Sequence, residues 1–307
     1  MTGPTRKAKP LSTRLNHFFQ YRSEGERVVF ERLRQAMSLP TILRRRAVAE
    51  RIVTDVPFTI DPEQGFRVFP PGTFPEALEI VRAATDLTRE LDLSRQELTR
   101  KARLGFMVPL LAGSDLTLES PFLRLALRSD VIATVSAYLR MVPVIAHLNV
   151  YYSAAGPEEP RFSQLFHCDG DATAQVKIFV HCSDVTPAQG PLTLLDAQTS
   201  RAVRKRVRYH FGDRVKDNDK RVATMLTPAN QHPIVGEAGT VCFVDTTRCF
   251  HFGSRVKQGT SPRVVTMIQY LPPSSFELPR DHRFGSPFRH LATPNLTHAQ
   301  RLVLGAV

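Results

Sequence analysis

The spacing of apolar residues changes near residue 142 and divides the chain into two halves. Before that point, apolar residues recur at intervals of three and four, which predicts amphipathic helices. We expect these helices over residues 23–52 (with a break at Pro40), 74–91, 94–104 and 120–139. From Val142 onward apolar and polar residues alternate, which is the period of a strand with one buried face.

The second half is predicted to contain many short strands joined by turns. We expect strands around residues 144–150, 174–181, 190–195, 240–244 and 263–271. Residues 202–225 are polar and basic, which indicates helix and loop inserted over one edge of the strands. Short strands at this spacing favour an antiparallel sandwich or barrel. The pattern therefore predicts an α+β fold, with a helical N-terminal half packed against a β-barrel.

The two halves are expected to form one domain. We expect a loose arm over residues 1–15, followed by a single domain over 16–307. Within that domain, a mainly helical part is expected at residues 16–141 and a barrel core at 142–275. The core would carry one insertion at 197–227, and a C-terminal extension would follow at 276–307. The 307 residues are enough for such a unit.

Positive charge is the compositional feature that changes this picture. The chain has a formal net charge of +12 at pH 7, with arginine runs at residues 44–46 and 201–208. Such an excess favours an anionic substrate or an acidic carrier protein, and solvated surface arginines are the alternative. Nucleic acid is not an expected partner, because the basic runs lack interleaved aromatic residues and the chain has no Trp.

The cysteines and the N-terminus bear on the cellular compartment. The four cysteines all lie in the C-terminal half without a Cys-x-x-Cys spacing, which predicts reduced, buried thiols. The first ten residues lack the apolar core of a secretory signal, and no apolar run is long enough to span a bilayer. We therefore expect a cytoplasmic location.

A candidate metal site is the most specific feature of the sequence. His167 and Asp169 are two residues apart, so a strand would point both side chains to one face and Cys168 to the other. His251 offers a second imidazole at the end of another predicted strand. Two histidines and one carboxylate form the facial triad of non-heme Fe(II) oxygenases. The alternative for His167 and Asp169 is an N-cap or a structural hydrogen-bonded pair. We assign His181, His210 and His232 to the core or the surface.

An ordered set of motifs extends this interpretation. His167-Cys168-Asp169 is followed by Gln-Gly-Pro-Leu at 189–192, Ala-Gly-Thr at 238–240, His-Phe-Gly at 251–253, and Arg263. In this order the chain resembles Fe(II)/2-oxoglutarate-dependent dioxygenases, most closely the phytanoyl-CoA dioxygenase-like superfamily. The resemblance covers about residues 148–272 and implies a double-stranded β-helix, or jelly-roll, core of the cupin-like kind.

The resemblance also implies cofactors and roles. His167, Asp169 and His251 would hold Fe(II), and Arg263 would pair with the distal carboxylate of 2-oxoglutarate, with O2 as the other cosubstrate. A surface salt bridge is the alternative for Arg263. Related halogenases lack the carboxylate at the position of Asp169, so hydroxylation or another oxidation such as desaturation is expected. The family often has Ser or Thr two residues after the late His, whereas this chain has Gly253.

Further residues are candidates for binding the cosubstrate or the substrate. Lys177 could bind a 2-oxoglutarate carboxylate or face water on an edge strand, and Thr193 could donate a hydrogen bond inside the core or simply pack. Tyr151 and Asn149 are expected to line the pocket. Arg248 could bind an anionic substrate group or lie in an exposed loop.

These observations predict an oxygenase that hydroxylates a small or carrier-linked substrate with an anionic group. Two other classes stay open: a cupin-type metal enzyme that needs no 2-oxo acid, and a cupin-like binding protein without redox chemistry. The sequence does not select among phosphorylated metabolites, acyl thioesters, amino acids and natural-product intermediates, because substrate-binding parts vary on a common core.

Overall fold

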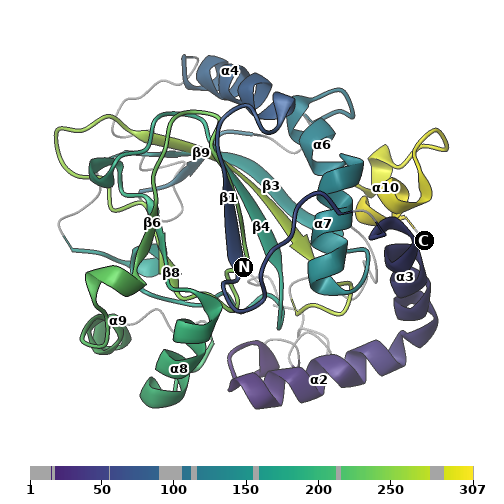
Figure 1. Cartoon of the computed structure of the whole chain (residues 1–307), viewed down its shortest axis with the longest axis horizontal. Coiled ribbons are helices and arrows are strands. Elements are labelled where there is room, and N and C mark those ends of the chain that lie inside the picture. Colours follow the sequence, from purple (N-terminus) through teal and green to yellow (C-terminus); the bar gives the residue numbers. More distant parts are fainter. Residues whose placement is uncertain are drawn as a thin grey trace, which may run out of the picture.

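A computed structural model describes residues 15, 18–54, 56–89, 106–111, 116–154, 159–211, 216–276 and 287–306 (Figure 1). Most helices of the N-terminal half gather on one side of the strands, and two helices of the C-terminal half lie on the opposite side (Figure 1). The helix expected at residues 94–104 and most of the expected arm at 1–15 lie outside the described residues.

Two antiparallel sheets form the core. The larger sheet has the strand order β1-β7-β4-β9-β3-β2, and the smaller has the order β6-β5-β8. The larger sheet comprises β1 (Phe66–Phe69), β2 (Val108–Pro109), β3 (Val144–Ser153), β4 (Val176–His181), β7 (Val241–Val244) and β9 (Arg263–Leu271). The smaller comprises β5 (Leu192–Leu194), β6 (His232–Ile234) and β8 (His251–Phe252).

The chain crosses between the sheets in a jelly-roll order. After β3 it passes His167, which forms a bridge with His251 and so extends the smaller sheet beyond β8. It then returns to β4, crosses to β5 and β6, returns to β7, crosses to β8 and ends in β9. This alternation confirms the predicted α+β fold with a jelly-roll core.

The helices follow the predicted ranges closely. The N-terminal half contributes α2 (Glu24–Met37), α3 (Leu39–Ile52), α4 (Pro75–Arg89), α6 (Pro121–Ala126) and α7 (Ser129–Leu139), and the C-terminal end adds α10 (His298–Val303). Helices α8 (Ala197–Val207) and α9 (Lys216–Ala223) lie between β5 and β6, within the range 197–227 where an insertion is expected. Single 3-10 turns are η2 (Phe162–Gln164), η3 (Pro187–Gln189), η4 (Pro228–Asn230) and η6 (Arg289–Leu291).

One cluster of buried apolar side chains joins the helices to the larger sheet. It includes Ile80 of α4, Val135 of α7, and Val150, Ile178 and Ile268 of the central strands, all of which are inaccessible to solvent. Burying each such side chain contributes about 1.5–3 kcal/mol. All four cysteines are buried and unpaired, as predicted. None of the helices in the described ranges is long and apolar enough to cross a bilayer.

Helix α2 is placed differently from what its apolar spacing indicates. The apolar residues of the predicted stripe point mostly outward, with Val29, Leu33 and Met37 exposed. Its buried residues are Arg27 and Glu31. The physical reason is that these two charged side chains find hydrogen-bond partners in the loop after the candidate metal ligand Asp169, so the polar face is the one that packs.

The arginine run at residues 44–46 is divided between surface and interior. Arg44 and Arg46 are exposed, whereas Arg45 is inaccessible to solvent. The Arg45 guanidinium donates to the carbonyls of Val142 and Pro143, each at 3.0 Å, and to that of Leu302. Burial lowers the pKa of Arg45 to about 10, so it stays protonated at neutral pH. This side chain therefore ties α3 to the segment just before β3 and to α10.

We expect Arg45→Leu to lower the free energy of unfolding by about 3 kcal/mol, because three buried carbonyls would lose their donor. Arg44→Leu is the matched control and should change it by no more than about 0.5 kcal/mol. Urea unfolding would measure both through the midpoint, with the slope checked for constancy. Equal midpoints for the two variants would contradict the structural role of Arg45.

Candidate metal centre

A pair of backbone hydrogen bonds brings the two predicted histidine ligands together. The His167 amide donates to the His251 carbonyl at 3.0 Å, and the His251 amide donates to the His167 carbonyl at 2.9 Å. The two residues are therefore directly opposite each other in an antiparallel bridge. Their imidazole rings lie on the same side, with centroids 4.1 Å apart. Residues 84 positions apart in sequence thus offer adjacent ligands.

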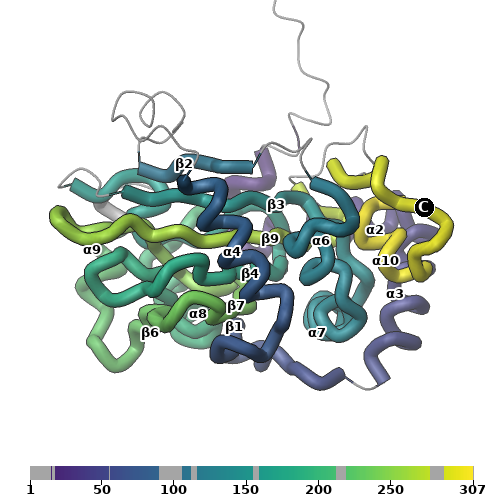
Figure 2. Tube along the Cα trace, turned by 90° about the horizontal axis from the view of Figure 1, so that it is seen from above, coloured from purple at the N-terminus to yellow at the C-terminus, as the bar shows by residue number. Residues whose placement is uncertain are grey.

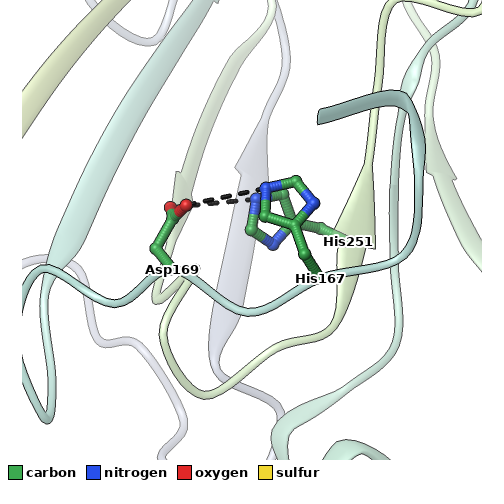
Figure 3. Close-up of side chains that lie close together, drawn as sticks. All are labelled: His167, Asp169 and His251. Carbon is green, nitrogen blue, oxygen red and sulfur yellow. Dashed lines mark ion pairs between the residues drawn. The ribbon is translucent and has the colours of Figure 1, made fainter. Parts of the chain in front are cut away.

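Asp169 completes the triad (Figure 3). Its amide donates to the Thr246 carbonyl at 2.9 Å, which fixes the backbone beside the bridge. Its Oδ1 lies 3.6 Å from Nε2 of His167, and its Oδ2 lies 3.8 Å from Nε2 of His251. Two donors bound about 2.1 Å from one ion can be up to about 4.2 Å apart. The separations therefore fit one metal ion between the three side chains.

The backbone sets the tautomer of both imidazoles. Nδ1 of His167 lies 2.8 Å from the Leu165 carbonyl, and Nδ1 of His251 lies 3.1 Å from the Cys249 carbonyl. A carbonyl only accepts, so each Nδ1 must carry the proton. Each Nε2 is then left with its lone pair directed toward Asp169, as in metal-binding histidines.

The electrostatic environment keeps His251 and Asp169 in the protonation states that bind metal. Burial, followed by the neighbouring His167, lowers the pKa of His251 to about 3, so its imidazole is neutral. Burial alone would raise the pKa of Asp169, but the charge of Lys177 holds this pKa well below its usual value. A neutral imidazole and an ionised carboxylate are the forms that coordinate a cation.

A second set of polar side chains orients the Asp169 carboxylate. Nζ of Lys177 lies 2.7 Å from Oδ2, and Nε2 of Gln175 donates to the same oxygen at 3.3 Å. Gln175 also donates to Oγ1 of Thr246 at 2.8 Å and accepts from Gln269 at 2.7 Å. The sequence reasoning missed both glutamines. Gln175 shares strand parity with Lys177, which was the signal that could have indicated its direction.

The triad opens on a cavity of about 170 Å³. At about 30 Å³ per water molecule, this volume is several times that of one water. The cavity wall is mostly apolar, and its polar members include the triad, Lys177, Ser254 and Arg263. Apolar members include Met107, Phe179, Leu192, Val265 and Met267. The site therefore has room for a small molecule beside an ion.

Arg263 is a buried cation on this cavity. It donates to the Gly190 carbonyl at 2.9 Å and to Oγ of Ser254 at 2.6 Å. Its Nε is buried and has no hydrogen-bond partner, and no carboxylate within the described ranges forms an ion pair with it. Burial lowers the pKa of Arg263 to about 10, which leaves it charged at neutral pH. An unneutralised buried guanidinium fits an anionic ligand.

Ser254 supplies the hydroxyl that the sequence lacks at Gly253. A Cβ at Gly253 would lie 3.5 Å from Nη1 of Arg263, so that position is in contact with the guanidinium but has no hydroxyl to offer. The next residue, Ser254, adopts a left-handed backbone with φ of 61° and brings its hydroxyl to Arg263 and to Ser153. The sequence reasoning missed Ser254, although its place directly after the glycine was a signal.

The other predicted residues are distributed unevenly around the site. Tyr151 lines the cavity, and its hydroxyl lies 2.6 Å from Nε2 of His147. The Thr193 hydroxyl instead donates to a backbone carbonyl in the preceding turn at 3.4 Å. Asn149 bonds to the backbone of Leu111, and Arg248 donates to the Tyr138 hydroxyl at 3.3 Å. These three lie outside the cavity lining.

Comparison with known proteins gives structural likenesses only. No protein-family model and no curated protein matches the chain. EctD from S. alaskensis, solved with 2-oxoglutarate and 5-hydroxyectoine, is 18% identical over 69% of this chain and 73% of that one, with a TM-score of 0.49. HygX from Streptomyces hygroscopicus, with nickel and 2-oxoglutarate bound, is 16% identical over 68% and 83%, with a TM-score of 0.47. At this identity, neither assigns an activity to the chain.

We expect His167→Ala and Asp169→Ala each to weaken Co(II) or Fe(II) binding by more than about 100-fold. Changes that only touch a ligand's neighbours already reduce affinity by about 10–100-fold, so removing a ligand should exceed that range. Anaerobic titration followed by visible absorption of the Co(II) complex would measure the affinity. His210→Ala is the control, since His210 is exposed and apart from the triad. Undiminished binding in the Asp169 variant would refute the site.

Proposed function

We propose that the protein is an Fe(II)/2-oxoglutarate-dependent oxygenase that hydroxylates or otherwise oxidises a small substrate. The observation that carries this proposal is the combination of a buried two-histidine, one-carboxylate triad and a buried arginine without a carboxylate partner on one cavity. When bound, iron and 2-oxoglutarate would supply O2 activation coupled to loss of CO2 and formation of succinate.

The triad suits iron because of its donors and its open side. His167, His251 and Asp169 supply two nitrogens and one oxygen, which is the donor set of non-heme Fe(II) oxygenases and leaves coordination positions free. Lys177 and Gln175 hold Oδ2 of Asp169. The ligand is thereby oriented before any ion binds, and positioning of this kind strengthens metal binding.

Charge supports a dianionic cosubstrate. Lys177 offsets the charge of Asp169, so an Fe(II) ion and Arg263 would leave the cavity strongly positive. A 2-oxo dicarboxylate would compensate this charge, with one carboxylate and the oxo group at the metal and the other carboxylate at Arg263. A guanidinium offers the paired donors that match a carboxylate. Ser254 is positioned by its hydrogen bond to Arg263 to complete that end of the site.

The apolar wall limits what else reaches the reacting centre. Phe179, Val265 and Met267 of the central strands face the cavity and exclude water from the space beside the triad. Among the described lining residues the only cations are Lys177 and Arg263. Lys177 is assigned to the metal ligand Asp169 and Arg263 to the cosubstrate, so neither is left to bind an anionic substrate. The basic runs at 44–46 and 201–208 are not part of this lining, so they do not by themselves support one. A small, weakly charged substrate is the one that these walls favour.

A metal enzyme that needs no 2-oxo acid is the second candidate. One observation favours it: Arg263 already donates to Gly190 and Ser254, so two of its nitrogens are satisfied within the protein. The two candidates differ in whether Arg263 contributes to binding a dicarboxylate.

We expect Arg263→Leu to raise the Kd of 2-oxoglutarate by about 10- to 100-fold, because one charge-assisted contact is lost, while Fe(II) affinity changes little. Anaerobic titration of the Fe(II) protein, followed by the visible metal-to-ligand charge-transfer band, would measure both. Arg255→Gln is the matched control, since Arg255 lies near the site but stacks on Phe252 and pairs with Asp219 instead. An unchanged 2-oxoglutarate Kd in the Arg263 variant would favour the second candidate.

A further inference from the structure

Helix α2 packs on the protein through its charged side. Arg27 donates to the carbonyls of Gly170, at 3.2 Å, and Ala172. Glu31 accepts from the Thr173 amide at 3.2 Å. These contacts hold the loop that directly follows Asp169. A helix seated by buried charges must turn its apolar side outward, which is the reverse of an ordinary surface helix.

The outward side of this helix belongs to a larger apolar surface. Val29, Leu33 and Met37 are 59%, 58% and 72% exposed, and they lie at helical spacing on one face. Leu39 and Leu43 continue the exposed residues onto α3. We name these five residues the N-terminal apolar surface. With Leu15, Phe18 and Tyr21, this region holds eight of the twelve large apolar residues that are exposed in the described ranges.

Positive charge is concentrated in the same part of the chain. Residues 1–51 contain twelve Lys and Arg against four Glu, so they carry eight of the twelve net positive charges. On the same two helices, Arg32 of α2 and Arg44, Arg46 and Arg51 of α3 are exposed. Apolar and cationic side chains thus share one region of the surface. This combination is typical of helices that lie on anionic membranes.

The position of the two helices fits a flat partner. Helices α2 and α3 form an outer corner of the molecule, away from the strands (Figures 1 and 2). Exposed leucine, methionine and valine side chains on such outer helices can enter a bilayer interface without a matching groove. Arginines at its border can direct their guanidinium groups to lipid phosphates. A second copy of the chain would bring the same excess of positive charge, and the two surfaces would repel each other.

From these observations we infer that α2 and α3 form a docking surface for anionic lipid membranes. The five residues of the N-terminal apolar surface would enter the headgroup region, and the surrounding arginines would pair with lipid phosphates. The protein would then bind at the membrane surface without spanning it. Such binding requires neither metal nor cosubstrate, so it can be tested apart from the proposed oxygenase activity.

Vesicle flotation with the full-length protein tests this inference. The probes are vesicles of about three parts phosphatidylcholine to one part phosphatidylglycerol, compared with phosphatidylcholine alone. We expect binding to the anionic vesicles at low salt and its loss as salt rises. Leu33→Gln combined with Met37→Gln should lower the partition coefficient at least about tenfold, since glutamine preserves helix propensity but not the apolar surface. Arg32→Gln and Arg44→Gln should each lower it about fivefold.

Matched variants test whether vesicle binding depends on this surface or on exposed apolar and charged residues in general. Leu78→Gln replaces an exposed leucine on α4, and Lys205→Gln with Arg206→Gln removes exposed charges on α8; both should bind as the wild type does. The inference is overturned if the wild type ignores anionic vesicles at low salt, or binds neutral vesicles equally well. It is also overturned if the Leu33 and Met37 variant binds undiminished. A stable wild-type dimer that this variant dissociates would assign the surface to a second copy instead.

Discussion

The candidate site depends on one antiparallel bridge, in which His167 and His251 exchange two backbone hydrogen bonds. The bridge sits at the end of the smaller sheet, so the jelly-roll crossings between sheets decide which residues meet there. Because the pairing is made by the backbone, the two imidazoles stay adjacent without any contact that a ligand must supply. Asp169 then joins them from two residues beyond His167, where its amide donates to the Thr246 carbonyl. The strand topology therefore determines where the candidate metal ligands meet, and their side chains determine what they can bind.

The second constraint is the charge of Asp169, a carboxylate that is almost fully buried. Burying an unpaired carboxylate is costly, and the structure offsets this cost with Lys177 and Gln175, which donate to its Oδ2. The loop after Asp169 is held in turn by Arg27 and Glu31 of α2. Helix α2 therefore packs by polar contacts that serve the site, and its apolar residues are left for another surface. The contacts that hold this loop thus also explain why Val29, Leu33 and Met37 face outward.

The sequence predicted those features that follow from local period and ordered spacing. The change from helical to strand spacing near residue 142 located the two halves, and the alternation around His167 placed Asp169 beside it. The orientation of α2 was not predictable, because the apolar spacing of Val29, Leu33 and Met37 carries no information on the loop that Arg27 and Glu31 bind. Ser254 was missed because its left-handed backbone shifts the hydroxyl by one position. Long-range hydrogen bonds, such as those between Asn149 and the backbone of Leu111, leave no periodic pattern in the sequence.

The measurement that tests the central claim most directly is an anomalous diffraction map at the iron edge. It would come from crystals grown anaerobically with Fe(II) and 2-oxoglutarate. We predict a single strong iron peak within bonding distance of Nε2 of His167, Nε2 of His251 and the Asp169 carboxylate. We also predict that the distal carboxylate of 2-oxoglutarate pairs with Arg263. An iron peak held by other residues, or a 2-oxoglutarate that makes no contact with Arg263, would contradict the account.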